Sequence, residues 1–317
     1  MYCMKIVEDT IEWLEPYKLG NYQFFRQWAA ESWVSTGGRL RKDIKLPWKL
    51  KMAIGKLGLV RRLPLMQLRY QKKLIVGVGG RPDYYCWPYN YTYEIVPVIW
   101  DCWPRYWRHL IRFLVRNDVK TVFCTSSQTA DMVRKNLPNV NAVWLPEGIK
   151  VDAYPMGPRL VERSIDILEV GRLKSGLADL IESGVKNVSY VRPQRNEYLF
   201  RSFEELTAGI RDAKMVVCYP RSDTNNEIAQ GVETLTQRYW ECMLSGSLII
   251  GHAPKELVRI CGYNPVIELG DDPVAKVKEI LSSIDSYQSL VDKNRAFAET
   301  NASWDNRMHI IRASLIG

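Results

Sequence analysis

The feature that most constrains the fold is a strand–helix alternation that occurs twice, once on each side of a connector. In the first half, short runs rich in β-branched residues, such as KKLIVGVGG (72–80) and VKTVFCTS (119–126), alternate with helical patterns. The alternation restarts at SIDILEV, residues 164–170. Because strands separated by helices pair in parallel through right-handed crossovers, each half predicts a parallel sheet with helices on both faces.

The other expected elements follow the same two patterns: strands are short apolar runs, and helices have apolar residues three or four positions apart. The first 70 residues do not fit the alternation. The remaining strands are expected at 93–100, 141–146, 187–191, 214–219, 247–251 and 265–269. The helices are expected at 104–117, 127–139, 200–213, 234–244, 253–261 and 272–284.

The length of 317 residues favours two domains over one. The stretch 148–164, which contains two glycines and two prolines, is the expected connector. We therefore predict an α/β protein with two Rossmann-like domains facing a cleft, an N-terminal domain over 1–150 and a C-terminal domain over 151–317. Ligands of open parallel sheets bind at the carboxyl ends of the strands, so the cleft is the expected site.

Several classes of protein and site are disfavoured by composition. The chain has no run of eighteen apolar residues, and its N-terminus lacks the basic and apolar regions of a secretory signal. Seven cysteines occur singly and three histidines form no cluster, which indicates buried, reduced thiols and no metal site. We expect a cytoplasmic protein, either free or peripheral at the inner face of the membrane, that needs no cofactor.

Basic side chains are concentrated in the segment 39–73, which contains twelve Lys and Arg and a single acid. The segment carries +11 in a chain of net charge +9. Between Pro47 and Pro64 its apolar residues share a helical face, with Trp48 at the edge. A basic amphipathic helix suits the surface of an anionic membrane. A solvated helix face and a nucleic-acid patch are the alternatives, but no recognisable nucleic-acid fold is evident and no nucleic acid is expected.

Two glutamates, Glu233 and Glu241, lie eight positions apart in GVETLTQRYWECMLSGSLIIG, residues 231–251. Thr234 and Gln237 have the spacing of a capping box, which predicts a helix that starts at about Leu235. Gly246 is expected to end that helix before a buried strand.

The start of this helix predicts an anion site. First-turn N–H groups are unpaired and carry about half a positive charge, so the amides of Leu235, Thr236 and Gln237 would hold a phosphate. Glu233 would lie on one side of it, and Glu241 would reach the group attached to its other end. Carboxylates accept hydrogen bonds from hydroxyl groups, and a sugar and a ribose joined by phosphates make a nucleotide sugar. An ordinary amphipathic helix with exposed acids is the alternative.

Three segments resemble GT-B glycosyltransferases, especially the retaining family 4 (glycosyl transferases group 1) type. The glutamate segment is similar to the signature of the C-terminal domain in that family. SIDILEVGRLKSG, residues 164–176, is similar to the strand and Gly-Arg that open the same domain. WLPEGIKVDAY, residues 144–154, is similar to the segment that closes the N-terminal domain. Together the matches cover roughly residues 94–250.

The resemblance implies roles for individual residues. Glu233 would bind hydroxyl groups of the donor sugar, and Glu241 would bind the ribose. Arg172, with Gly171 before it and Lys174 after it, would neutralise the departing diphosphate, whose negative charge grows as the glycosidic bond breaks.

Three further residues have open interpretations. Arg238 either contacts the phosphate or forms an ion pair with the glutamate that follows it. Arg221, in the polar loop 219–231, is either a phosphate ligand or part of a solvated loop. Asp101, in IWDCWP, resembles a strand end of the family in which a His precedes the Asp, but Trp100 occupies that position. Asp101 therefore either faces the cleft in a catalytic role or is buried as a helix cap before Pro104.

The sequence as a whole predicts a glycosyltransferase that moves a sugar from a nucleotide diphosphate donor to a glycan or lipid-linked acceptor. The resemblance implies bacterial surface polysaccharide synthesis and retention of the anomeric configuration. A nucleotide-sugar epimerase or hydrolase on the same fold is one alternative, and a non-catalytic scaffold on the membrane surface is another. A nicotinamide-dependent oxidoreductase is disfavoured, because the glycines at 77, 79 and 80 lack the rest of a dinucleotide fingerprint.

Overall fold

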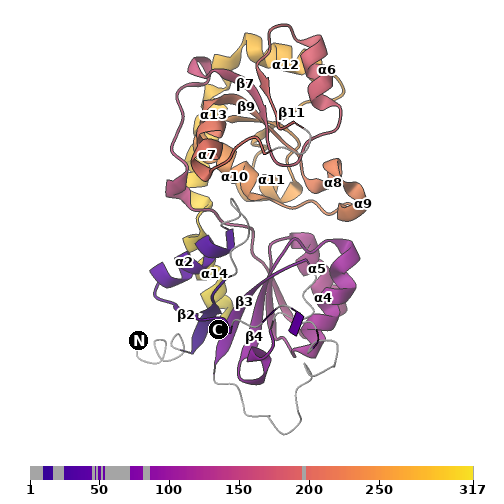
Figure 1. Ribbon diagram of the computed structural model, residues 1–317, viewed down its shortest axis with the longest axis vertical. Coiled ribbons are helices and arrows are strands. Elements are labelled where there is room, and N and C mark those ends of the chain that lie inside the picture. The colour runs from indigo at the N-terminus through magenta and orange to yellow at the C-terminus, as the bar shows by residue number, and fades with distance from the viewer. Residues whose placement is uncertain are drawn as a thin grey trace. The chain divides into compact units, whose positions relative to one another are not determined.

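The chain folds into two compact α/β units (Figure 1). The computed structural model describes residues 10–16, 25–44, 47, 49–50, 53, 72–80, 86–194 and 198–316. Unit 2 contains Glu147–Ser303, and unit 1 contains the described residues before it together with the terminal stretch that begins at Trp304. The chain thus enters unit 2 close to the expected boundary at residue 150. It differs from the expected division because its last helix belongs to unit 1.

Unit 1 contains a six-stranded parallel sheet with the strand order β2-β1-β3-β4-β5-β6. The four strands expected in the first half form the larger part of it, and two short strands come from the first 70 residues, where none was assigned. The strands are β1 (Ile11–Leu14), β2 (Arg39–Arg41), β3 (Lys73–Gly79), β4 (Glu94–Trp100), β5 (Thr121–Cys124) and β6 (Asn141–Trp144).

Helices lie on both faces of this sheet, as the alternation predicts (Figure 1). The helices of unit 1 are α2 (Phe25–Ser35), α4 (Pro104–Arg116), α5 (Ser127–Asn136) and α14 (Trp304–Ile316), and a short 3-10 turn is Tyr89–Tyr91. Proline at the first position favours the start of α4, because its missing N–H would be unpaired there anyway. The Ser126 side chain caps α5 by accepting the Thr129 N–H at 3.4 Å.

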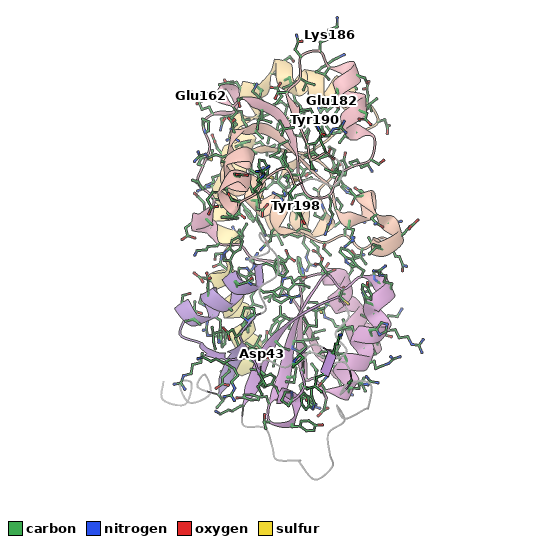
Figure 2. The ribbon with its side chains drawn as sticks, viewed as in Figure 1. Asp43, Glu162, Glu182, Lys186, Tyr190 and Tyr198 are labelled. Carbon is green, nitrogen blue, oxygen red and sulfur yellow. The ribbon has the colours of Figure 1, made fainter. Side chains whose placement is uncertain are left out.

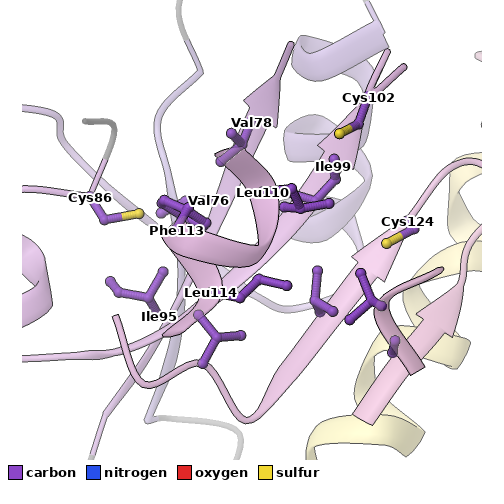
Figure 3. Close-up of a cluster of buried hydrophobic side chains, with 14 of the residues drawn as sticks. Val76, Val78, Cys86, Ile95, Ile99, Cys102, Leu110, Phe113, Leu114 and Cys124 are labelled. Carbon is purple, nitrogen blue, oxygen red and sulfur yellow. The ribbon is translucent and has the colours of Figure 1, made fainter. Parts of the chain in front are cut away.

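The two faces of β3 differ in character. Val76 and Val78 point into a buried cluster with Leu110 and Phe113 of α4 (Figure 3). Residues of the opposite face include Gly77, whose missing Cβ would lie 3.2 Å from the ring of Trp100. That ring packs against Phe25 at 5.6 Å and Trp304 at 6.0 Å between centroids, so α2 and α14 cover this face.

Unit 2 contains a five-stranded sheet with the order β11-β10-β9-β7-β8, and all of its strand pairs are parallel. Every strand coincides with an expected one. The strands are β7 (Ile165–Glu169), β8 (Tyr190–Val191), β9 (Ala213–Cys218), β10 (Leu248–Gly251) and β11 (Val266–Glu268).

The helices of unit 2 cover both faces of its sheet (Figure 1). Four of them, α7, α10, α11 and α12, were expected; α6, α8, α9 and α13 were not. They are α6 (Leu177–Gly184), α7 (Phe203–Asp212), α8 (Arg221–Thr224), α9 (Asn226–Ala229), α10 (Gln237–Ser245), α11 (Lys255–Cys261), α12 (Pro273–Ser282) and α13 (Gln288–Asn301). Short 3-10 turns lie at Val151–Ala153, Leu160–Glu162 and Ile284–Tyr287.

Two expectations from composition can be compared with the described residues. Six cysteines there are free thiols and five of them are buried, which confirms the prediction of reduced, structural cysteines. Burial raises the pKa of Cys102 to about 12, so this thiol is not a reactive thiolate at neutral pH. None of the helices in the described part of the chain is long and apolar enough to cross a bilayer.

Candidate active site

The carboxyl ends of β7, β9 and β10 form the edge of the unit 2 sheet where a ligand is expected. From β7 the chain goes to β8 on one side and then returns to β9 on the other side. Such a reversal leaves a crevice outside the carboxyl ends of the two central strands. The predicted residues Gly171, Arg172 and Lys174 follow β7 directly, and Arg221 follows β9. The topology therefore brings these four predicted residues to one edge.

The loop after β7 is held by a buried carboxylate. Glu169, the last residue of β7, is 1% exposed. It accepts the backbone N–H of Lys174 at 2.7 Å and the hydroxyl of Tyr190 on β8 at 3.0 Å. Tyr190 is labelled in Figure 2. Gly171 between them has a φ of +91°, and its open side faces the Arg238 guanidinium, 3.8 Å from the position of a Cβ. Glycine is required there because side chains rarely adopt this conformation.

Burial raises the pKa of Glu169, and the hydrogen bonds from Lys174 and Tyr190 only partly oppose it. A carboxyl group with a raised pKa in the folded state makes folding less favourable as pH rises from its ordinary value through the raised one. We expect Glu169→Gln, which cannot ionise, to remove this fall in folding stability with rising pH. Urea unfolding of the wild type and the variant from pH 4.5 to 7.5 should show the free-energy difference shifting toward the variant as pH rises. A difference that stays constant would contradict the assignment.

The loop after β9 is tied to the loop after β7 through Lys174. Its Nζ donates to the backbone carbonyl of Asp223 at 3.0 Å and lies 5.1 Å from the ring centroid of Tyr219. Burial raises the pKa of that tyrosine to about 12, with the carboxylates of Asp223, Glu268 and Glu169 adding to the effect. The ammonium group therefore lies between the two loops, in contact with neutral oxygen and an aromatic face.

Arg172 and Arg221 are both partly buried. The charge of Arg172 reaches the first turn of α10, where it lowers the pKa of Tyr239, although burial raises that pKa far more. Arg221 is the first residue of α8. The structure thus places Arg172 between β7 and the start of α10, where the sequence expects it, and places Arg221 in a helical turn rather than in an extended loop.

The start of α10 differs from the predicted capping box. The helix begins at Gln237, with Thr236 as a cap whose side chain makes no capping bond. The Gln237 side chain donates to the carbonyl of Gly148 at 3.1 Å instead of reaching back to the cap. The Leu235 N–H donates to the buried carboxylate of Glu256 at 2.9 Å, which holds this residue outside the helix. The prediction of a start at Leu235, and of its amide as a phosphate ligand, is therefore wrong.

The backbone amides available for an anion at the start of α10 are those of residues 236–238, not 235–237 as predicted. Among the described residues, no acceptor lies at hydrogen-bond distance of the backbone N–H groups of Thr236, Gln237 and Arg238. These three amides, at the positive end of the helix dipole, remain available to an anionic ligand. The other end of α10 follows the prediction, because Gly246 ends the helix with a φ of +69°.

Glu241 lies in a polar cluster inside unit 2 and is 7% exposed. Its Oε1 accepts the hydroxyl of Tyr154 at 3.0 Å, and its Oε2 lies 2.6 Å from Nη1 of Arg238, which is one turn earlier on α10. Burial is the largest single influence on the pKa of Arg238 and lowers it, but the charges of Glu241, Cys242, Cys218 and Tyr154 together outweigh burial, so the pKa is raised. Burial and the same carboxylate raise the pKa of Tyr154. The ion-pair interpretation of Arg238 is confirmed, and the ribose role of Glu241 stays a prediction.

Glu233 lies outside α10, as the sequence predicts, and is partly buried. Its Oε2 accepts the backbone N–H of Lys255, the first residue of α11, at 3.2 Å. A carboxylate has about four acceptor positions, so this contact leaves room for sugar hydroxyl groups. The bond to Lys255 ties this side chain to the start of α11.

Asp101 belongs to unit 1, at the carboxyl end of β4. It is exposed, and its φ of +49° is a conformation that Asp tolerates better than most residues. The next helix, α4, has Trp103 rather than Asp101 as its cap. The alternative of a buried helix-capping Asp101 is therefore wrong, and its catalytic role stays a prediction.

Sequence reasoning missed four acidic or basic residues at the unit 2 edge: Glu169, Glu256, Asp223 and His252. Nδ1 of His252, which follows β10, lies 2.5 Å from Oδ2 of Asp223, which follows β9. Glu169 and His252 could have been found from their positions at strand ends, where ligands of parallel sheets bind. Nothing local in the sequence pairs Asp223 with a histidine 29 residues later, or Glu256 with an amide 21 residues earlier.

The arrangement can bind a diphosphate through fixed positive charge. Arg172, Lys174 and three available amides lie at one edge of one sheet, and Glu233 stands next to them as an acceptor of hydroxyl groups. Preorganised charge of this kind stabilises a leaving group whose negative charge increases. In the described part of the chain, no three His, Cys, Asp or Glu side chains cluster as metal ligands.

No protein-family model matches the chain, and no curated protein matches it in sequence. Solved structures do match its fold. The Anabaena protein HepE, solved in complex with UDP and glucose, superposes with a TM-score of 0.64 over 96% of this chain and 98% of its own, at 11% identity. A sucrose-phosphate synthase from Thermosynechococcus elongatus gives the same TM-score, identity and coverage.

A glycosyltransferase from Rickettsia africae superposes with a TM-score of 0.60 over 98% of this chain and 99% of its own, at 11% identity. Similarity at this low identity over nearly the whole length shows a shared fold. The chain therefore has the GT-B glycosyltransferase fold with two Rossmann-like units, which confirms the fold class expected from the sequence.

Proposed function

We propose that this protein is a glycosyltransferase that uses a nucleotide diphosphate sugar as its donor. One observation carries the proposal: Arg172, Lys174 and the amides of Thr236, Gln237 and Arg238 lie at the carboxyl edge of β7 and β9 in a GT-B fold. The fold alone does not specify chemistry, so the residues of this site support the function. HepE, which shares the fold, binds UDP-glucose and UDP in its solved complexes.

Within this proposal, Glu233 binds hydroxyl groups of the donor sugar and Glu241 binds the ribose. The cations and helix amides carry the charge of the leaving diphosphate, so the reaction needs no metal. Asp101 contributes from the acceptor side, and Gly171 allows the backbone to approach the phosphates. We further propose a glycan or lipid-linked acceptor, a role in bacterial surface polysaccharide synthesis and retention of configuration, all of which rest on the resemblance in sequence.

Nucleotide binding is the first test. Calorimetric titration of the wild type with UDP, GDP and ADP should give measurable affinity for at least one. Arg172→Gln should weaken that affinity about tenfold or more, because a charge-assisted hydrogen bond to a phosphate is lost. The matched control is Arg159→Gln, which removes an arginine that is exposed and pairs with Asp285 before β7 begins.

The alternatives give different results in the same experiment. An epimerase or hydrolase on this fold would bind nucleotides and be sensitive to Arg172→Gln, but would convert the donor without any acceptor. A nicotinamide-dependent oxidoreductase would bind NAD in preference to nucleoside diphosphates. A scaffold would bind no nucleotide, and equal affinity of the two arginine variants would also contradict the transferase proposal.

The basic segment 39–73 is proposed as the contact with an anionic membrane surface. Most of it, including most of the predicted helix between Pro47 and Pro64, lies outside the described residues. Its described beginning is β2, an edge strand whose three residues are all exposed. The two arginines of that strand continue the basic character of the segment at the surface of unit 1.

Vesicle binding tests this contact. Each basic residue near an anionic surface contributes about 1 kcal/mol, so replacing Lys49, Lys51, Lys56, Arg61 and Arg62 by Gln should release the protein from vesicles that contain phosphatidylserine. Sedimentation at low and high salt measures the effect, and salt should weaken wild-type binding. The control replaces five exposed basic residues of unit 2. Unchanged sedimentation of the 49–62 variant would remove the membrane proposal.

A further inference from the structure

His252 is a partly exposed imidazole fixed at the edge of unit 2 where the donor diphosphate is proposed to bind. Its side chain is 32% exposed, and that of its partner Asp223 is 24% exposed. The backbone N–H of His252 donates to the carbonyl of Cys218 at 3.0 Å. Its carbonyl accepts the hydroxyl of Tyr239, in the first turn of α10, at 2.7 Å. The residue is therefore fixed between the end of β9 and the start of α10.

Asp223 determines which imidazole nitrogen is available. An ionised carboxylate only accepts hydrogen bonds, so Nδ1, 2.5 Å from Asp223 Oδ2, must carry a hydrogen. Nε2 is the remaining polar atom, and no described residue lies at hydrogen-bond distance of it. When the ring is protonated, Nε2 becomes a charged donor.

The surroundings of His252 are those of the proposed phosphate site. Asp223, its partner, accepts Lys174 Nζ through its backbone carbonyl at 3.0 Å. Tyr239, which contacts the His252 carbonyl, lies one residue after the last of the three available amides and within the field of Arg172. His252, after β10, is therefore connected through Asp223 to Lys174. It is connected through Tyr239 to the start of α10, where the charge of Arg172 also acts.

We propose that His252, oriented by Asp223, is a ligand of the donor diphosphate and binds it in the imidazolium form. This inference rests on the proposed function and adds a residue and a pH dependence to it. The resulting hydrogen bond is charge-assisted, with the cation on Nε2 and the anion on a phosphate oxygen.

The proposal makes donor affinity depend on pH. Histidine is the side chain that ordinarily changes charge between about pH 5 and 8. Asp223 from α8 contacts the ring, and Tyr239 from α10 contacts the His252 carbonyl. The other charged or titratable groups act on the neighbours of His252: Lys174 on Asp223, Arg172 on Tyr239, and Glu268 from β11 on the N–H of the residue after His252. Tyr219, after β9, is affected by Asp223 and Glu268. Carboxylates, Lys and Arg ordinarily keep their charge between about pH 6 and 8. Burial keeps both tyrosines neutral by raising their pKa.

Two substitutions separate a ligand from a structural pair. His252→Asn places an amide nitrogen where Nδ1 is, so it keeps the bond to Asp223 but removes Nε2. His252→Gln places an amide nitrogen near the Nε2 position and loses the bond to Asp223. If His252 is purely structural, His252→Asn should keep the donor affinity and His252→Gln should lose it. If His252 is a ligand, His252→Gln should bind the donor more tightly than His252→Asn at high pH.

Binding of intact nucleotide sugars is the measurement, because their esterified diphosphate does not titrate between pH 5.5 and 8.5, unlike the terminal phosphate of a nucleoside diphosphate. UDP-glucose, GDP-mannose and ADP-glucose are titrated into the full-length wild type, and the one that binds most tightly is used. The wild-type affinity should fall about tenfold from pH 5.5 to 8.5. His252→Asn should bind about tenfold more weakly at pH 5.5, with a flat pH profile.

Each other outcome overturns the proposal. Wild-type affinity that does not change with pH, or a His252→Asn variant that matches the wild type, removes the imidazolium ligand and leaves the proposed function intact. Failure of the wild type to bind any of the three nucleotide sugars overturns both. Thermal unfolding of the two variants, measured in parallel, identifies any loss of affinity that comes from a loss of folded protein.

Discussion

Glu233→Gln is expected to reduce donor turnover at least a hundredfold while it leaves nucleotide affinity within about threefold. The carboxylate is assigned to hydroxyl groups of the transferred sugar, whose contacts strengthen as charge develops at the reacting carbon, and loss of one such group typically costs 10²–10³ in rate. Gln keeps an acceptor oxygen for the Lys255 N–H, so the start of α11 stays anchored. Turnover is followed as nucleoside diphosphate released from the donor.

The control for this experiment is Glu227→Gln. Glu227 lies on α9 in the same loop region, is exposed and should not change turnover. If Glu233→Gln weakens nucleotide binding as much as it slows turnover, the division between a sugar ligand and nucleotide ligands is wrong. If turnover is unchanged, Glu233 has only the structural role of receiving the Lys255 amide.

Arg238→Met is expected to destabilise unit 2 by about 3 kcal/mol or more, because removal of one partner leaves the Glu241 carboxylate buried without its cation. The arginine side chain is 22% exposed and that of the glutamate 10%, so solvent screens the pair only slightly. The Tyr154 hydroxyl is the one hydrogen-bond partner of Glu241 within the described part that would remain. Urea unfolding measures the loss.

The double variant Arg238→Met, Glu241→Gln is the matched test of this explanation. Replacement of both charges should recover most of the lost stability, since the cost comes from the unpaired charge. No recovery would mean that Arg238 acts through packing rather than through the ion pair. A nucleotide affinity that stays low in the recovered double variant would support the ribose role of Glu241.

The elements that could be predicted are those with strong local signals. The strands of unit 2, four of its helices (α7, α10, α11 and α12) and strands β3 to β6 of unit 1 follow from apolar runs and helical spacing. β1 and β2 were missed because they lie in the first 70 residues, which lack the strand–helix alternation that identified equally short strands such as β6 and β11. The return of the terminal helix to unit 1 depends on contacts such as Trp100 with Trp304, which no local pattern reveals.

The candidate site shows the same division between local and distant information. Gly171, Arg172 and Lys174 could be named because residues 164–176 are similar to the strand and Gly-Arg that open the C-terminal domain of the family, and their roles stay predictions. The start of α10 was misplaced because Glu256, far along the chain, captures the Leu235 amide and overrides the capping-box pattern. The contacts of Tyr154 with Glu241 and of Asp223 with His252 could not be predicted, because these residues meet only after the sheet has formed.

The proposed function depends on unit 2 binding a diphosphate at the carboxyl ends of β7 and β9. A crystal structure of the protein soaked with the tightest-binding nucleoside diphosphate tests it most directly. We expect phosphate density in contact with Arg172 and with the amides of Thr236, Gln237 and Arg238. Density at any other place, with those amides and Arg172 facing only solvent, would contradict it.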